Sequence, residues 1–223
     1  MKKFELTNEF VTNMFGTKLF RIRALVEFGD VEAGELGGYV EKESNLGHDD
    51  NAWVYGDARV YDNALVYDNA RVYGDAQVSG DARVYDNARV YGDAWVYGDA
   101  WVYGNALVCG NARVYDNARV YGDARVYGDA WVYGNARVCG DALVCGDARV
   151  CGNGDYAYAH GFGSVNRTTT FFRLKDGGVG VRCGCFYGTL AQFRDKIRET
   201  HGETKKAQEY LMLADLMKLR FEK

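Results

Sequence analysis

Hydrophobic positions recur with a fixed period of six residues through the middle of this chain. Alanine occupies every sixth position from Ala52 to Ala148, and valine every sixth position from Val54 to Val150. The unit occurs seventeen times without an insertion. Each hexad reads Ala, a variable residue, Val, then Tyr, Cys or Ser, then Gly or Asp, then Asp or Asn. Its first four positions alternate as in a short β-strand, so the pattern predicts a coil of strands separated by bends.

The variable residue indicates which side of these strands points inward. It is Arg in nine of the hexads, for example Arg59, Arg113 and Arg149. Unpaired guanidinium groups cannot line a core. We therefore expect Ala and Val to fill the interior, while Arg, Trp, Leu and Tyr point outward. The fifth and sixth positions are Gly or Asp and then Asp or Asn, residues that tolerate the left-handed backbone of sharp bends.

Residues 51–152 resemble the hexapeptide-repeat family. The resemblance rests on an aliphatic residue followed four positions later by a small one, as Val54 is by Ala58 and Val60 by Ala64. It implies a mainly β fold, a left-handed parallel β-helix with three hexads in each triangular turn. The hexads would then make just under six turns, about 27 Å long at a spacing of ~4.8 Å. The residue after Val is usually small in that family and is mostly Tyr here, which is a change of the surface.

The flanks suggest a cap at each end, since an open coil would expose strand edges. We divide the chain into an N-terminal β cap (1–50), the coil (51–152), a linker (153–167) and a C-terminal hairpin with two helices (168–223). Residues 18–28 predict a long strand. Residues 34–46 predict a degenerate opening turn, with Leu46 in the phase of the Ala positions.

The C-terminal part predicts a small α+β module. Segments 168–174 and 179–186 flank the turn 175–178 and indicate a hairpin. Thr189 and Gln192 form a capping-box pattern for a helix that ends at Gly202, and a second helix follows over about 204–221. This module is either a cap or an oligomer contact. The order of GELGGYVEKESNL, the hexads and CFYGTLAQFRDKIRETHGE resembles uncharacterised hexapeptide-repeat proteins of phages and prophages.

Composition and charge limit the partners and the cellular compartment that we expect for this protein. The net charge of −4 predicts no strong general attraction to nucleic acid or to an anionic membrane. The start MKKFELTNEF has no apolar stretch typical of a signal peptide, and no apolar run reaches the ~20 residues of a membrane helix. We expect a protein of the cytoplasm of a bacterial host cell, with its six cysteines as free thiols.

The resemblance also implies two kinds of enzyme, acyltransferases and γ-class carbonic anhydrases, and both need histidine. The chain has only His48, His160 and His201, all outside the hexads, and no loop interrupts the hexads. We therefore expect no enzyme, no cofactor and no metal site. An acyltransferase in which His48 and His160 meet across an oligomer contact is kept as an alternative.

The cysteines give weak signals. Cys109, Cys139, Cys145 and Cys151 occupy the outward Tyr position. With eighteen residues per turn, Cys109 and Cys145 share a column two turns apart, beyond the reach of a disulfide. Cys183 and Cys185 form a C-x-C pair without a partner pair, which is little evidence for a metal.

The outward positions are rich in Trp, Arg and Tyr. All four tryptophans occupy the variable position, and twelve tyrosines occupy the fourth position. Stacked turns would align them in columns, which either form stabilising ladders or make a contact surface. Four exposed tryptophans would be unusual for a lone monomer. The candidate binding residues are Trp53, Arg59, Trp95, Tyr97, Trp101, Arg113, Tyr115, Arg119 and Trp131.

Together these features favour a non-catalytic, oligomeric, phage-type binding protein. Trimers are usual in the resembled fold. A small anionic aromatic ligand, such as a nucleotide signal, would suit Arg beside aromatic rings, on a face or at a subunit seam. Long nucleic acid is disfavoured because Asp residues at the bends surround the Arg. The alternatives are a purely architectural spacer and the acyltransferase.

Overall fold

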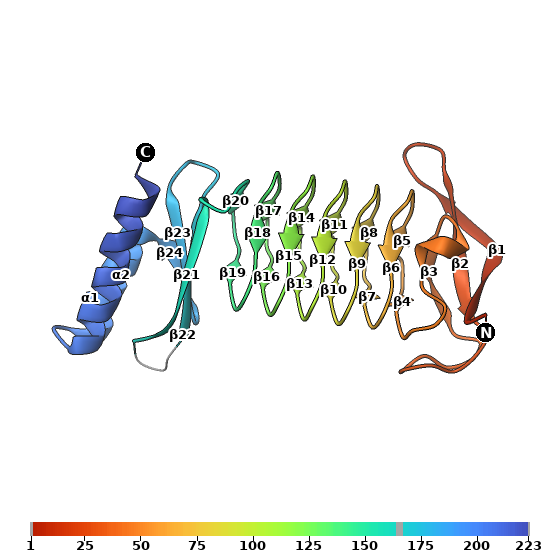
Figure 1. Ribbon diagram of the computed structural model, residues 1–223, viewed down its shortest axis with the longest axis horizontal. Helices are drawn as coiled ribbons and strands as arrows, with labels where there is room; N and C mark the ends of the chain where they lie inside the picture. The colour runs from red at the N-terminus through yellow and green to blue at the C-terminus, as the bar shows by residue number, and fades with distance from the viewer. Residues whose placement is uncertain (1, 164–166, 223) are drawn as a thin grey trace.

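The computed structural model describes residues 2–163 and 167–222. Figure 1 shows an elongated molecule with a regular coil in the middle. A small sheet lies at the N-terminal end of the coil, and a second sheet with two helices lies at the C-terminal end. The predicted mainly β fold with a cap at each end is confirmed.

The coil is built from seventeen two-residue strands between residues 53 and 150, a stretch that is described without a gap. Each strand consists of the variable residue and the Val of one hexad. They are β4 (Trp53–Val54), β5 (Arg59–Val60), β6 (Leu65–Val66), β7 (Arg71–Val72), β8 (Gln77–Val78), β9 (Arg83–Val84), β10 (Arg89–Val90), β11 (Trp95–Val96), β12 (Trp101–Val102), β13 (Leu107–Val108), β14 (Arg113–Val114), β15 (Arg119–Val120), β16 (Arg125–Val126), β17 (Trp131–Val132), β18 (Arg137–Val138), β19 (Leu143–Val144) and β20 (Arg149–Val150).

Each coil strand pairs in parallel with the strand eighteen residues further on, as Arg89 pairs with Leu107. The strands therefore form three sheets, one on each side of the coil. We call the sheet β5-β8-β11-β14-β17-β20 face A, the sheet β6-β9-β12-β15-β18 face B, and the sheet β4-β7-β10-β13-β16-β19 face C. Three hexads per turn and a coil of about six turns follow from this pairing.

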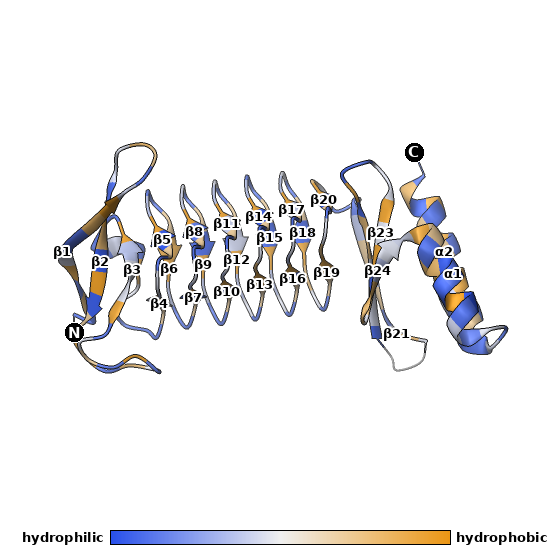
Figure 2. Cartoon of the chain, turned by 180° about the vertical axis from the view of Figure 1, so that it is seen from behind, coloured by the Kyte–Doolittle hydropathy of each residue, from blue (hydrophilic) through white to orange (hydrophobic). Residues whose placement is uncertain are grey.

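The interior of the coil is filled by the Ala and Val of every hexad. All of these side chains are at most 1% exposed, from Ala52 to Val150. Figure 2 shows hydrophobic and hydrophilic residues alternating along the turns. Burying one Val stabilises the fold by about 1.5–3 kcal/mol, and only if the adjacent turns cover it. The predicted direction of the side chains is confirmed.

The bends use a left-handed backbone at the fifth position of the hexad. Asp62, Asp68, Asp86 and Asp116 have positive φ there, as do most glycines at the same position. The Asp side chain also accepts a hydrogen bond from the backbone N–H of the bend one turn further on. The Gly80 N–H donates to Asp62 at 3.1 Å, and the Gly134 N–H donates to Asp116 at 3.2 Å. Asp therefore adds a contact between turns that Gly cannot make.

The N-terminal cap continues face A. It consists of β1 (Phe4–Thr12), β2 (Lys18–Ala24), β3 (Leu36–Val40) and the 3-10 helix η1 (Glu43–Asn45). β1 and β2 pair antiparallel, as do β2 and β3, and β3 pairs in parallel with β5. The strand predicted within 18–28 is confirmed as β2, although it ends at Ala24, and β1 was not predicted.

The opening turn is longer than the regular ones. Val40 pairs with Val60 and Leu46 pairs with Val66, twenty residues apart instead of eighteen. The degenerate turn is thus confirmed, but the expected phase of Leu46 is wrong, because Leu46 lies at a Val position. The regular spacing begins at Asp50, whose carboxylate accepts the backbone N–H of Asp68 at 2.7 Å.

The C-terminal sheet contains four strands among the described residues: β21 (Tyr156–Phe162), β22 (Arg167–Arg173), β23 (Val179–Cys183) and β24 (Phe186–Thr189). The predicted hairpin is confirmed as β22–β23, but its second strand ends at Cys183 and not at Phe186, which begins β24, a strand that was not predicted. The linker predicted at 153–167 is wrong, because β21 pairs with β22 over much of that range. Tyr156 ties β21 to the coil, since it is buried and its hydroxyl donates to the Arg137 carbonyl at 2.5 Å. Positions 164–166 of the predicted linker lie outside the described residues.

Strand β22 closes the C-terminal end of the coil. Phe172 is fully buried and belongs to the same core as the Ala and Val of the hexads. Leu174 forms a bridge with Ala148, and Thr170 Oγ1 accepts the backbone N–H of Leu143 at 2.9 Å. The last turn therefore has an apolar lid and paired backbone groups.

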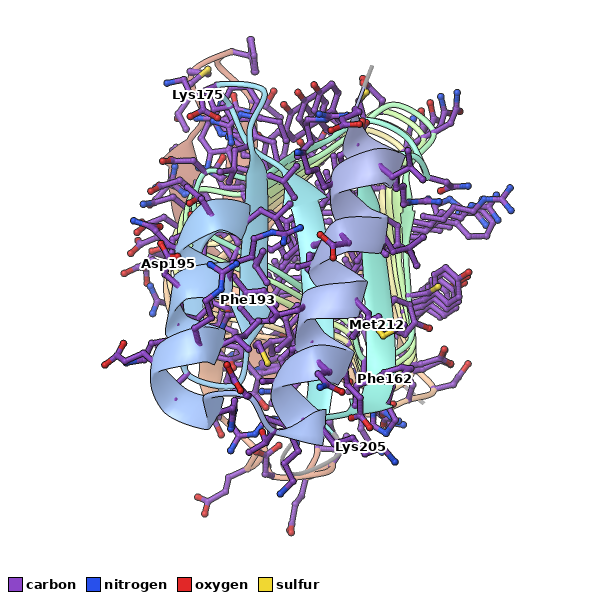
Figure 3. All side chains as sticks on the ribbon, turned by 90° about the vertical axis from the view of Figure 1, so that its left-hand side faces the viewer. Phe162, Lys175, Phe193, Asp195, Lys205 and Met212 are labelled. Atoms are coloured by element: carbon purple, nitrogen blue, oxygen red, sulfur yellow. The ribbon has the colours of Figure 1, made fainter. Side chains whose placement is uncertain are left out.

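Two helices cover the other side of this sheet, α1 (Leu190–His201) and α2 (Lys205–Phe221) (Figure 3). The predicted capping box of Thr189 and Gln192 and the helix end at Gly202 are confirmed. Phe171, Phe193 and Tyr210 lie in the core between the sheet and the helices. Neither helix, nor any other in the described chain, has the length and apolar character to cross a membrane.

Candidate binding surfaces

Outward side chains of successive turns are superimposed in columns when the coil is viewed from its C-terminal end (Figure 3). On face A, Arg and Trp alternate along one column. The Arg113 guanidinium lies 5.2 Å from the ring centre of Trp95 and 5.1 Å from that of Trp131. Arg149 lies 4.1 Å from the ring of Trp131 on the other side. Each of these contacts is a cation–π interaction.

Face B repeats the arrangement once. Trp101 lies between Arg83, at 5.1 Å from its ring centre, and Arg119, at 4.5 Å. On both faces a Trp ring thus fills the space between two guanidinium groups that are two turns apart.

A second column on each of these faces consists of stacked tyrosines. Tyr97, Tyr115 and Tyr133 stack on face A with ring centres 4.9 and 5.1 Å apart. Four more stack on face B at 5.0 Å, namely Tyr67, Tyr85, Tyr103 and Tyr121. Burial, together with the neighbouring hydroxyls of Tyr67 and Tyr103, raises the pKa of Tyr85 to about 12. The ladders that the sequence predicts are confirmed.

These stacks decide which groups a ligand can reach. Neighbouring rings or guanidiniums cover the flat faces of the central Tyr and Trp rings, so ring edges and Arg N–H groups remain. Within residues 2–163 and 167–222, the side chains of Arg113 and Arg119 make no hydrogen bond and no ion pair. Both guanidiniums are stacked, and their N–H donors are not used by the chain.

The expectation of four exposed tryptophans is wrong. Trp53 is completely buried, because Phe4 and Phe28 of the N-terminal cap pack against it at 6.1 and 5.3 Å between ring centres. Trp95, Trp101 and Trp131 are half-buried. Trp53 is therefore inaccessible to a ligand and is withdrawn as a binding residue.

The other candidate residues lie on two different faces. Trp101 and Arg119 are on face B. The remainder are on face A, in two adjacent columns. They are Arg59, Trp95, Tyr97, Arg113, Tyr115 and Trp131. Arg59 is half-buried and pairs in register with Tyr39 of the cap. The sequence thus predicted two surfaces that the coil keeps apart.

Face C has a surface feature that sequence reasoning missed. A hollow of about 360 Å³ opens over Leu107, between Arg89 and Arg125. Leu107 pairs in register with both arginines, at eighteen residues on either side. The spacing of these three residues is visible in the sequence once three hexads are assigned to each turn.

The histidines lie in the caps and are not brought together within the chain. His48 stacks on Phe4 at 4.4 Å, and its Nδ1 accepts the backbone N–H of Lys3 at 3.3 Å. His160 Nδ1 lies 2.9 Å from Thr168 Oγ1. Across the described parts of the chain, no cluster of three or more His, Cys, Asp or Glu is placed to hold a metal ion.

All six cysteines are free thiols in the structure. Pairing of β13, β16 and β19 places Cys109 and Cys145 in one column, two turns apart, as predicted. Cys145 is buried, and its burial raises the pKa of the thiol. Cys183 Sγ accepts a hydrogen bond from Thr169 Oγ1 at 3.2 Å.

The hexads match a protein-family model described as the YdcK β-solenoid repeat. The matching ranges are 52–67, 58–74, 66–80, 76–92, 82–98, 118–134 and 130–146. These ranges all lie within the coil, so the repeats of this chain are similar to those of YdcK β-solenoids. No curated protein matches the chain.

Proposed function

We propose that this protein is a non-catalytic β-solenoid binding protein of phage type, which self-associates and sequesters a small nucleotide-like anion. The observation that carries the proposal is the state of the Arg113 guanidinium. It is held between Trp95 and Trp131, yet it has no acid partner among the described residues. An arginine fixed in this way is organised in advance for an external anion.

The chemistry of the guanidinium supports this reading. Stacking uses the flat faces of the group, while its in-plane N–H donors stay available for phosphate or carboxylate. The surrounding coil is rigid, because every turn is fixed by backbone hydrogen bonds to the next, such as Arg113 N to Ala130 O at 2.9 Å. Little conformational entropy is therefore lost when a ligand binds.

Apolar residues exposed at the two ends of the molecule support self-association. Met212, Leu216 and Leu219 follow one another at helical spacing along α2 and are 71%, 55% and 70% exposed. Met14 and Phe15, at the tip of the β1–β2 hairpin, are equally open. Patches of this kind mark contact sites on soluble proteins. The resembled fold makes a trimer the first oligomer to expect.

Light scattering after size exclusion tests self-association. We expect one discrete species, with three chains per particle. Met212→Lys combined with Leu216→Lys should reduce its mass if α2 takes part, whereas Lys206→Glu on the same helix should not. A polydisperse particle that grows with concentration would instead support the architectural alternative, in which the coil is a spacer.

Calorimetry with a panel of nucleoside monophosphates and diphosphates tests sequestration. We expect saturable heat from at least one of them, and no heat from any would remove this part of the proposal. For the acyltransferase alternative, we expect no acyl-CoA turnover. Turnover lost in His48→Ala or His160→Ala would overturn the non-catalytic assignment.

A further inference from the structure

One arrangement recurs on all three faces of the coil, an outward residue between two arginines two turns apart. On face A that residue is Trp131, between Arg113 and Arg149. On face B it is Trp101, between Arg83 and Arg119. In both cases the indole lies 4.1–5.1 Å from each guanidinium carbon.

On face C the middle residue is Leu107, between Arg89 and Arg125. Leu is too small to fill the space that an indole occupies on the other faces. The result is the hollow of about 360 Å³, which is lined by Leu107 and the two arginines together with Tyr73, Tyr91, Asn87 and Asn105. No carboxylate lines it.

Among the described residues, the guanidinium groups of the two arginines at this hollow have none of the side-chain contacts that the stacked arginines of faces A and B make. Arg89 and Arg125 are both exposed. Over residues 2–163 and 167–222 neither side chain makes a hydrogen bond, an ion pair or a cation–π contact. Two turns of a parallel sheet separate the two backbone positions by about 9–10 Å. This is the separation at which the chain itself places a flat ring between two arginines on faces A and B.

We propose that the hollow between Arg89 and Arg125 binds a planar aromatic anion, whose ring takes the place of the missing indole. The ring lies over Leu107 between the two guanidiniums, and its anionic group pairs with their N–H donors. Asn87 Nδ2 donates to Asn105 Oδ1 at 3.3 Å, which leaves the Asn87 oxygen to accept a ring N–H. A purine nucleotide has all of these features.

This site gives the ligand class of the proposed function a binding place on face C, in addition to the stacked Arg113 of face A. It rests on the proposed function only for the choice of a nucleotide. The general class, a planar aromatic anion, follows from the geometry of face C, and self-association is not required.

Calorimetry with two probes, guanosine 5′-monophosphate and naphthalene-1-sulfonate, tests the site. Leu107→Trp supplies the ring that the other faces contain, so the fold is preserved and the hollow is filled. We expect binding of either probe to weaken at least about tenfold, because the filled hollow no longer allows the two cation–π contacts and the ion pair with the probe. Leu65→Trp makes the same exchange on face B beside Arg83 and should leave binding unchanged.

The converse variant, which opens a hollow on face B, is a more stringent test. Trp101→Leu on face B leaves a Leu between Arg83 and Arg119, as face C has between its own two arginines. We expect one additional site, so the stoichiometry should rise by one probe per chain. For the unmodified protein, guanosine and ribose 5-phosphate should each bind at least about tenfold more weakly than guanosine 5′-monophosphate, because each lacks one half of the recognised chemistry.

The outcomes separate this site from the proposed function. Nucleotide binding that survives Leu107→Trp overturns the site but keeps sequestration. Naphthalene-1-sulfonate binding that is lost in Leu107→Trp, with no heat from any nucleotide, supports the site and removes nucleotide sequestration. If neither probe binds the unmodified protein, the site is overturned.

Discussion

The carboxylate of Asp86 accepts a hydrogen bond from the backbone N–H of Gly104, one turn further along the coil, at 3.0 Å. Asp86 itself has φ of 56°, a left-handed conformation that L residues rarely adopt. The contact gives a physical reason for Asp at the fifth position of some hexads, because Asp tolerates the bend and also pairs a backbone donor of the next turn.

Asp86→Ala removes this hydrogen bond and places an alanine in the left-handed region. We expect a loss of about 1–3 kcal/mol of unfolding free energy. Asp86→Gly loses the same hydrogen bond without the strain and should cost about 1 kcal/mol less. Urea unfolding followed by circular dichroism measures both. Equal stability of the two variants would show that backbone strain at this bend is negligible.

Gly104→Ala tests how closely adjacent turns approach each other. Gly104 has φ of 71°, and a Cβ there would lie 3.0 Å from the backbone nitrogen of Gly122. Gly177→Ala is the matched control, because φ is 84° and nothing lies within 4 Å of the added carbon. We expect about 1 kcal/mol of destabilisation at Gly177 and at least twice as much at Gly104. A smaller loss at Gly104 than at Gly177 would contradict tight stacking of the bends.

Phe172→Ala removes the lid of the C-terminal end. The side chain is fully buried in the core of the coil, so we expect a loss of about 3–5 kcal/mol of unfolding free energy. The last turn would also become accessible, and light scattering should show aggregation before unfolding is complete. Phe162→Ala, at a partly exposed position on β21, should change neither measurement appreciably. The prediction fails if the two variants behave alike.

The stacked tyrosines predict a loss of stability at high pH. Burial, with Tyr67 and Tyr103 beside it, raises the pKa of Tyr85 to about 12, whereas an unfolded chain has tyrosines near their ordinary value of about 10. The folded state therefore keeps a proton that the unfolded state releases. Stability should be constant below pH ~10 and should fall between pH ~10 and ~12.

Ultraviolet absorbance of tyrosinate in the folded and the urea-unfolded protein measures this difference. Tyr85→Phe removes the hydroxyl in the middle of the face B column and should make the decline with pH shallower. An unchanged decline would mean that other groups cause it.

The period of the hexads determines the interior of the coil so strictly that Val114 could be assigned to it from sequence alone. Each hexad has one small and one branched aliphatic residue on one side and Arg or Tyr on the other, and only one orientation avoids buried charge. The same reasoning fails at the ends. Leu46 is shifted by two residues and Trp53 is covered by Phe4, because a cap obeys packing with distant segments and not the local period.

Predicting which side chains share a column also requires the number of hexads per turn, which the hexad pattern alone does not contain. With that number supplied by resemblance, Cys109 and Cys145 could be assigned to one column, and the structure agrees. The hollow over Leu107 was missed for another reason. Trp and Tyr mark the columns that are filled, whereas the proposed site is marked by a smaller residue where a ring would otherwise be.

The three-sided coil joins two caps that differ from each other, so its length also sets their relative orientation. Insertion or loss of three hexads would move the caps apart or together by roughly 4.8 Å and leave their orientation unchanged. Insertion or loss of a single hexad would turn one cap by a third of a revolution relative to the other. A change in the number of hexads would therefore alter both the distance between the caps and their relative rotation, and variants that preserve both caps in register should differ in length by multiples of eighteen residues.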